Sequence, residues 1–178
     1  MENGIKKILR DKYGLFEKDI EILLEKFTRF SVPKREIILQ ERQTDHYIYF
    51  VEKGIVKSTI LREGREFIIF FALENDVPLS SPNLTESRQS LYTLEAVDTC
   101  ILWRISRKDL ATSFKDSLNL SNWGRMILQE WLTSSSFYFS SIHWMSKKEQ
   151  YQYLLKEMPK LIQRLSMRDL SAWLDITP

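Results

Sequence analysis

The chain has 178 residues, of which 43% are hydrophobic, and 26 basic residues nearly balance 24 acidic ones to leave a formal net charge of +2 at pH 7. This composition predicts a folded globular chain and lacks the basic excess of a module that holds DNA through phosphate contacts alone. The single cysteine, Cys100, excludes an internal disulfide and a cysteine-bound iron–sulfur cluster.

The N-terminal region has the spacing of short helices. Its first 14 residues, MENGIKKILRDKYG, lack the apolar core of a signal peptide, and no stretch of the chain reaches the roughly 18 apolar residues of a membrane span. We therefore expect a cytoplasmic protein with no membrane partner. Between residues 5 and 30 the apolar positions recur at helical intervals, with an interruption near Gly14.

From Pro33 onward the pattern changes to strands. Short runs of aromatic and β-branched residues alternate with polar or glycine-containing turns, at intervals of roughly 8 to 12 residues. This spacing is typical of an antiparallel sandwich or barrel. The predicted strands are residues 36–39, 47–51, 55–61, 67–71, 91–97 and 100–105.

A short helix and a long one are predicted to follow the strands. Ser106, with Asp109 three residues later, is typical of a helix start, and a helix from about 117 to 142 would be roughly 35–40 Å long. That length exceeds one small barrel, so we expect the same helix of a second subunit to pack against it. The alternative is a helix lying on its own barrel, and serines at 134–136 and 140–141 could mark a kink. The predicted dimer contacts are Leu120, Ile127, Trp131, Ser134 and Tyr138.

The C-terminal stretch, residues 166–178, predicts the first helix and turn of a helix-turn-helix. Ser166 and Asp169 have capping spacing, and Thr177-Pro178 is typical of a second helix start. The recognition helix would come next, so we interpret the motif as truncated. An ordinary helical hairpin would give the same pattern.

The order of these parts resembles the Crp/Fnr superfamily of bacterial transcription regulators. The resemblance covers nearly the whole chain and is carried by YIYFVEKGIVK and by Asp-Leu-x-x-Trp-Leu-x-Ile-Thr-Pro at the C-terminal end. It implies an α+β fold with three parts: a cyclic-nucleotide-binding-like antiparallel β-roll (double-stranded jelly roll) with flanking helices over 1–115, a long dimerisation helix over 116–145, and a partial winged helix-turn-helix over 146–178.

The resemblance further implies a homodimeric, DNA-binding regulator that is not an enzyme. DNA contacts are expected near the last helices. The candidates are Gln163, Arg164, Arg168 and Thr177. The alternative is a ligand-sensing or dimerising module that does not bind DNA in this truncated form.

The segment that would bind a cyclic nucleotide departs from the family pattern. Family members that bind such ligands carry a Gly-Glu pair and an Arg followed by a small hydroxyl residue, whereas residues 74–90 contain no glycine and Arg88 comes two positions early. Strand alternation would let Arg88 point inward at another depth. We therefore expect no tight binding of cyclic AMP and a different small effector, unless this stretch is only a solvated loop. The candidate contacts are Ser80, Ser81, Arg88 and Ser90.

No other chemistry is indicated. His46 and His143 have no partner ligand nearby in sequence, and no phosphate loop or nucleophile motif is present. We expect no metal, no cofactor and no catalytic residue, and Cys100 is interpreted as a core residue.

Overall fold

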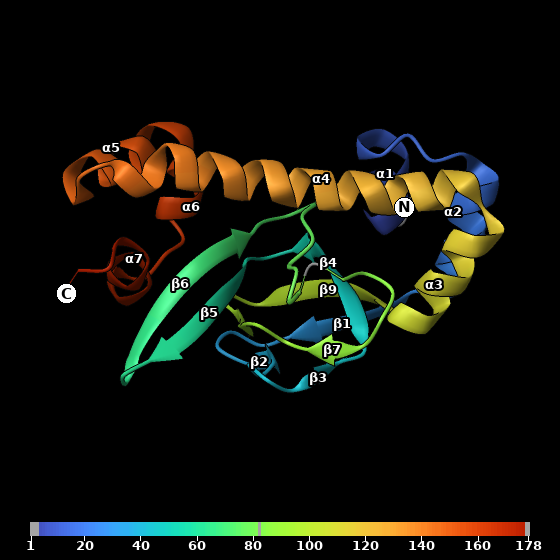
Figure 1. Ribbon diagram of the computed structural model, residues 1–178, viewed down its shortest axis with the longest axis horizontal. Coiled ribbons are helices and arrows are strands. Elements are labelled where there is room, and N and C mark those ends of the chain that lie inside the picture. The colour runs from blue at the N-terminus through green and yellow to red at the C-terminus, as the bar shows by residue number, and fades with distance from the viewer. Residues whose placement is uncertain (1–3, 82, 177–178) are drawn as a thin grey trace.

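The computed structural model describes residues 4–81 and 83–176 and has an antiparallel β-roll lying beneath one long helix. Figure 1 shows this helix, α4 (Leu118–Ser140), running along the molecule, with the N-terminal helices and α3 (Arg107–Asp116) near one end. Three helices near the C-terminus gather at the other end. The architecture confirms the predicted fold class, an α+β chain built on a β-roll.

The N-terminal region forms short helical segments, as predicted. α1 (Gly4–Lys7) runs into a π-helical turn, η1 (Ile8–Lys12), and the chain then turns at Gly14, whose φ of +66° is easily adopted only by glycine. α2 (Glu17–Leu24) follows. The predicted helical stretch is wrong at its end, because β1 (Thr28–Val32) is a strand of the roll.

All six predicted strands are present, and the sheets are antiparallel. They are β2 (Ile37–Leu39), β4 (Tyr47–Lys53), β5 (Val56–Arg62), β6 (Arg65–Ala72), β8 (Thr93–Ala96) and β9 (Cys100–Ser106). The sheet orders are β1-β9-β4 and β2-β8-β5-β6. Glu63 and Gly64 both have positive φ, as a type I′ hairpin turn between β5 and β6 requires.

A third, two-stranded sheet was not predicted. β3 (Thr44–Asp45) pairs with β7 (Arg88–Gln89), where the sequence indicated a turn and a loop. Two residues are too few to display the alternation by which a strand is recognised. This small sheet nevertheless fixes the loop that spans residues 74–90, which we call the cassette loop.

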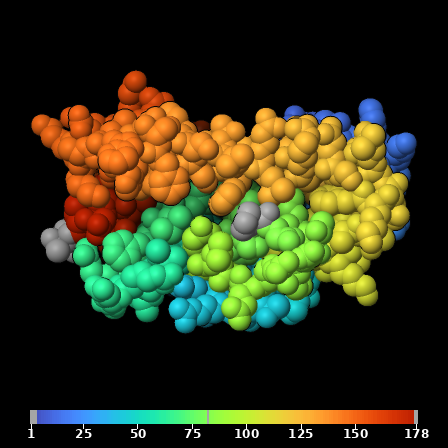
Figure 2. Space-filling view, in the orientation of Figure 1, coloured from blue at the N-terminus to red at the C-terminus, as the bar shows by residue number. Residues whose placement is uncertain are grey.

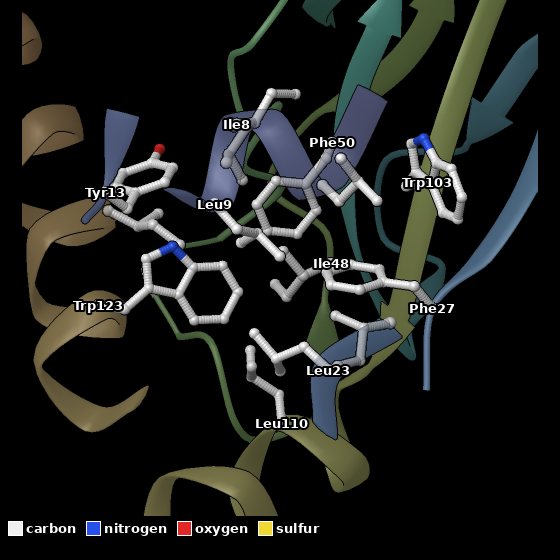
Figure 3. Packing of buried hydrophobic residues seen from close by; sticks show 14 of the residues in the cluster. Ile8, Leu9, Tyr13, Leu23, Phe27, Ile48, Phe50, Trp103, Leu110 and Trp123 are labelled. Atoms are coloured by element: carbon white, nitrogen blue, oxygen red, sulfur yellow. The ribbon is translucent and has the colours of Figure 1, made fainter. Parts of the chain in front are cut away.

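The largest apolar core surrounds Trp123 of α4. Its indole stacks on Phe50 at a centroid distance of 5.7 Å and makes an edge contact with Tyr13 at 6.1 Å (Figure 3). It makes a second edge contact, with Phe114 at 6.4 Å. Gly124 permits this approach, since a Cβ there would lie 2.4 Å from the Phe114 ring. The first half of α4 is therefore a core element of its own subunit.

This packing corrects part of the predicted dimer interface. Leu120 and Ile127 are only 1% and 2% exposed, and Trp131 packs against the same core. The alternative, a helix lying on its own roll, holds for this half of α4. Of the remaining predicted contacts, Ser134 is exposed and Tyr138 is half-buried.

α4 is continuous through its serine-rich stretch, so the kink is not observed, and it ends at Ser140, two residues earlier than predicted. A 3₁₀ turn, η2 (Ile142–Trp144), follows it. No helix within the described ranges is both long and apolar enough to cross a membrane.

Three helices complete the described chain, and local signals explain where each begins. α5 (Lys147–Glu157) starts with a capping box, α6 (Pro159–Ile162) starts with proline, and α7 (Met167–Leu174) is capped by Ser166, whose Oγ accepts the Asp169 N–H at 3.1 Å. The predicted start at Ser166 is thus confirmed. The predicted second helix start, Thr177-Pro178, lies outside the described residues.

Candidate ligand-binding site

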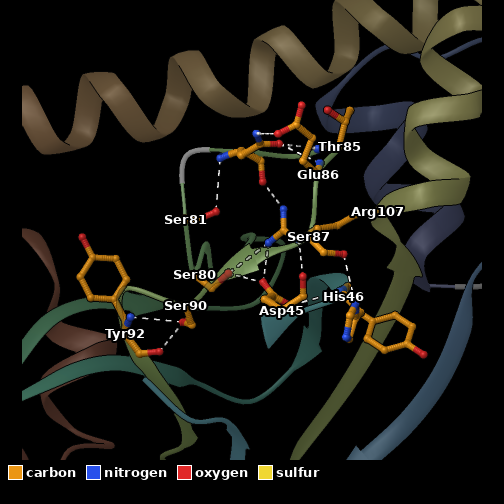
Figure 4. A network of polar contacts seen from close by, with 12 residues as sticks. Asp45, His46, Ser80, Ser81, Thr85, Glu86, Ser87, Ser90, Tyr92 and Arg107 are labelled. Carbon is orange, nitrogen blue, oxygen red and sulfur yellow. Dashed lines mark hydrogen bonds and ion pairs between the residues drawn. The ribbon is translucent and has the colours of Figure 1, made fainter. Parts of the chain in front are cut away.

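The cassette loop is held by a buried arginine that the sequence did not reveal. Arg107, at the first position of α3, forms an ion pair with the Asp45 carboxylate and donates to Ser80 Oγ at 3.1 Å and to the Asp45 carbonyl at 3.2 Å. It also donates to the carbonyl of Asn83. Figure 4 shows Arg107 beside Asp45 and Ser80. Because Asp45, Ser80 and Arg107 are buried together, their charges and lone pairs satisfy one another.

Three of the predicted ligand contacts are hydrogen-bonded to groups of the loop or of the elements beside it. Ser80 is occupied by Asp45 and Arg107, and the Ser81 hydroxyl accepts the Asn83 N–H at 3.4 Å. Ser90 Oγ donates to the carbonyl of Tyr92 at 2.5 Å. These serines are buried, but the contacts given for them are with the loop and its neighbours.

Arg88 does not point inward, contrary to the expectation from strand alternation. Its side chain is 64% exposed and lies 2.5 Å from Glu86. The reason is that β7 has only two residues, both exposed, and pairs with β3 at the surface of the roll. The sequence-based argument assumed a longer strand with one face turned to the interior.

A separate cavity of about 220 Å³ lies between β6, the start of the cassette loop and α4. Its walls are mainly apolar, but two carboxylates and one hydroxyl also line it. None of the four predicted ligand contacts lines this cavity. The lining residues are Phe70, Phe71, Leu73, Asp76, Val77, Leu79, Ile127, Glu130, Trp131, Ser134 and Met158.

The two carboxylates share one lysine. Lys12 Nζ lies 3.1 Å from Glu130 Oε2 and 3.6 Å from Asp76 Oδ1, and the Tyr13 hydroxyl donates to Glu130 at 3.2 Å. Burial raises the pKa of Asp76, although the Leu73 N–H and Lys12 act against it. Burial, followed by the charge of Glu130, raises the pKa of Tyr13 well above its ordinary value. The rim of the cavity is therefore a poor place for another anion.

The C-terminal helices are fastened to the roll by charges. Lys57, almost fully buried, lies 2.9 Å from Asp169 and slightly farther from Glu66 and Glu95. Arg164 lies 2.6 Å from an Asp98 oxygen and 2.9 Å from a Glu74 oxygen.

Apolar contacts complete this attachment, including an edge contact of 4.8 Å between Phe71 and Trp173. We call the attachment, centred on Lys57, Arg164, Phe71 and Trp173, the docking seam. Figure 2 shows the red C-terminal end, which includes α7, between the orange α4 region and the green β5–β6 hairpin.

The docking seam changes the interpretation of the predicted DNA contacts. Arg164 is engaged with two carboxylates of the roll, so in this arrangement it does not offer a free guanidinium to a phosphate. Gln163 and Arg168 are exposed. Thr177 lies outside the described residues.

Neither a metal centre nor a reactive thiol is indicated by the geometry. In the part of the chain that the structure describes, no three His, Cys, Asp or Glu side chains are placed to hold a metal ion. Cys100 is buried, and burial raises the pKa of its thiol to about 11. A thiol with so high a pKa is a weak nucleophile at neutral pH.

Comparison with known proteins identifies the roll. The model of the cyclic nucleotide-binding domain family matches residues 29–117, which is half of the chain. No curated protein matches the chain in sequence.

Solved structures match over more of the chain than the family model does. FixK2 from Bradyrhizobium japonicum is similar at a TM-score of 0.74 and 23% identity, over 85% of this chain and 78% of that one. The regulator CLP from Xanthomonas campestris is similar at a TM-score of 0.73 and 17% identity, over 91% of this chain and 86% of that one. A protein of Eubacterium rectale described as a putative Crp/Fnr-family regulator is similar at a TM-score of 0.71 and 19% identity, over 95% of this chain and 80% of that one. By the match of its roll, the chain belongs to the cyclic nucleotide-binding domain family.

Proposed function

We propose that the chain acts as a Crp/Fnr-like, DNA-binding transcriptional regulator controlled by a small effector other than cyclic AMP. The observation that carries this proposal is the extent of the structural likeness. FixK2 and CLP match 85% and 91% of the chain, far more than the half that the family model covers, so the likeness extends beyond the roll. CLP is described as a c-di-GMP-responsive global regulator of virulence gene expression, and the Eubacterium rectale protein as a transcriptional regulator.

The cassette loop supports the exclusion of cyclic AMP. Its buried hydroxyl, Ser80, is bound by Arg107, and its own arginine, Arg88, faces outward. Among the described residues of the loop and of the start of α3, a cyclic phosphate would meet only arginines that already pair with a carboxylate, and it would have to displace one of these ion pairs. Calorimetry with cyclic AMP and cyclic GMP at millimolar ligand should give no tight binding, and a micromolar affinity for either would contradict the proposal.

Dimerisation is proposed through the outer face of α4. Leu132 and Phe139 are seven residues apart and are 60% and 64% exposed, and Leu118 and Arg125 continue the same seven-residue row. Rows of this period pack against a second helix in coiled coils. This row replaces the buried Leu120 and Ile127 of the sequence-based interface.

Light scattering tests the dimer. We expect the wild-type chain to be dimeric and the Leu132→Glu, Phe139→Glu double variant to be monomeric. Leu61→Glu is the matched control, because Leu61 on the β5–β6 hairpin is 62% exposed and lies away from α4. A monomeric wild-type chain would remove the proposed interface.

DNA binding is tested by fluorescence anisotropy with a labelled duplex over a range of salt concentrations. Arg168→Glu should weaken binding and reduce its salt dependence, because each phosphate contact contributes to the salt slope. Arg88→Glu is the control, because Arg88 is exposed on β7 and pairs with Glu86 of its own loop, not with a residue of the C-terminal helices. If the chain dimerises but binds no duplex at low salt, the alternative function, a sensing or dimerising module without DNA binding, is the correct one.

A further inference from the structure

We propose that the cavity between β6, the cassette loop and α4 binds a small amphipathic cation, such as a protonated amine carrying an aromatic or aliphatic body. The inference rests on the proposed function, since it names the chemical class of the effector that a regulator of this kind would sense.

The walls of the cavity determine the apolar part of the ligand. At about 220 Å³ the cavity exceeds the ~150 Å³ that accepts benzene in an engineered apolar site. Phe70, Phe71 and Trp131 supply aromatic surface, and Leu79 and Ile127 supply aliphatic surface. A single ring or a short branched chain matches this size, and a mainly apolar wall with few polar groups is typical of ligand sites.

The charges at the rim determine the polar part of the ligand. Asp76 and Glu130 line the cavity, and no lysine or arginine does among the described residues. Among the described residues, Lys12 is the one cation that pairs with either of them, so its single charge is shared between two carboxylates. The local balance is one negative charge, which a bound ammonium group would neutralise and a bound anion would double.

A comparison with another buried carboxylate, Asp45, explains why the cation site lies at Asp76 and Glu130. Asp45 is also partly enclosed by the cassette loop, but the guanidinium of Arg107 already balances its charge. Asp76 and Glu130, in contrast, share the single charge of Lys12. An aromatic wall beside them, Trp131, would add a cation–π attraction for an ammonium group held over its face.

The position of the cavity connects the ligand to the rest of the molecule. Met158, which lines the cavity, is the residue between α5 and α6, and α6 leads directly to Arg164 of the docking seam. A ligand that displaces Met158 would therefore move the helices that the docking seam holds on the roll. Through this contact, occupancy would alter the orientation of the C-terminal helices.

Three probes with one apolar body and different charges test the inference. Calorimetry on the full chain would compare 2-phenylethylamine, 2-phenylethanol and 3-phenylpropanoate. We expect the amine to bind about tenfold or more tightly than the alcohol, and the carboxylate to show no binding. Equal or tighter binding of the carboxylate, or no binding of the amine at millimolar concentration, would overturn the inference.

Variants locate the binding. Glu130→Gln should remove the preference for the amine over the alcohol, and Asp76→Asn should reduce that preference, while thermal unfolding verifies that each variant folds. Glu86→Gln is the matched control, because Glu86 is an exposed acid on the same loop outside the cavity. An amine preference that survives both cavity substitutions would place the site elsewhere and refute the assignment.

A DNA-binding measurement with and without 2-phenylethylamine separates the two proposals. Amine binding with no change in DNA affinity supports the cation site and counts against regulation by it. DNA binding without any amine binding supports the proposed function and refutes the cation site.

Discussion

The two ends of α4 are attached to the roll by different physical means. Near its N-terminal end, Trp123 and its neighbours are enclosed by apolar side chains from the N-terminal helices, β4 and α3. Beyond its C-terminal end, α6 and α7 are attached through the docking seam, where Lys57 and Arg164 contact five carboxylates beside an apolar strip. Apolar burial does not depend on pH or salt in the way that ion pairs do. We therefore expect the first attachment to persist when pH or salt changes, and the second to weaken when the charges of the docking seam change.

The largest expected effect is the loss of Trp123. Trp123→Ala removes a fully buried indole that stacks on Phe50, and such truncations cost about 3–5 kcal/mol because a cavity remains. Urea unfolding should show this loss equally at low and high salt. A loss below about 1 kcal/mol would mean that the region repacks and is not the rigid end of the molecule.

The second effect concerns Lys57. Lys57→Met leaves three carboxylates around an uncharged side chain, and since these acids keep some contact with solvent we expect a loss of about 2–3 kcal/mol, below the full cost of an unpaired buried charge. Hydrogen exchange should show that α7 loses protection while the Trp123 region does not. Lys53→Met, at an exposed position on β4, is the matched control and should leave both regions unchanged. Equal loss of protection at both ends would contradict the separation.

The fold was largely predictable because its signals are local. Serines at 106 and 166 marked the starts of α3 and α7, and the alternating runs marked six strands. The orientation of α4 was not predictable from its period, because Leu120 and Ile127 would recur at the same spacing against a roll or against a second helix. A periodic pattern predicts that a face is buried and does not say what buries it.

The candidate site was less predictable, because its charged residues depend on partners far away in sequence. Arg107 is buried only because Asp45, 62 positions earlier, comes beside it, and Lys57 is buried because Asp169 lies 112 positions later. Neither residue differs locally from a surface charge. The serines of the cassette loop were predicted from their residue type, whereas the cavity is lined by side chains from four separate parts of the chain: β6, the start of the cassette loop, α4 and Met158.

The third prediction uses pH to release only the docking seam. Burial alone would raise the pKa of Asp169, but hydrogen bonds from Ser166 and Lys57 outweigh it and hold that pKa below its ordinary value. The stabilisation is therefore present above about pH 4, the ordinary value for aspartate, and is lost as pH falls through the lower pKa of the folded state. Hydrogen exchange of α7 should increase in that acidic range, before the core around Trp123 opens. Asp169→Asn should remove this part of the pH dependence, and an unchanged profile in that variant would contradict the assignment.

The smallest effect is expected at Arg164. It distinguishes the exposed ion pairs of Arg164 from the buried ion pairs of Lys57 within the docking seam. Lys57 has a side chain only 4% exposed, whereas the Arg164 side chain is 32% exposed and its partners are similarly accessible, so solvent screens its ion pairs. Arg164→Gln should cost about 1 kcal/mol or less at low salt and still less at high salt, because mobile ions weaken exposed pairs more than buried ones. Urea unfolding at both salt concentrations, beside Lys57→Met, measures the difference. The loss of unfolding free energy in Arg164→Gln could instead be as large as that in Lys57→Met and independent of salt. In that case the ion pairs of Arg164 behave as buried ones, and releasing the C-terminal helices would require more than a change in surface charge.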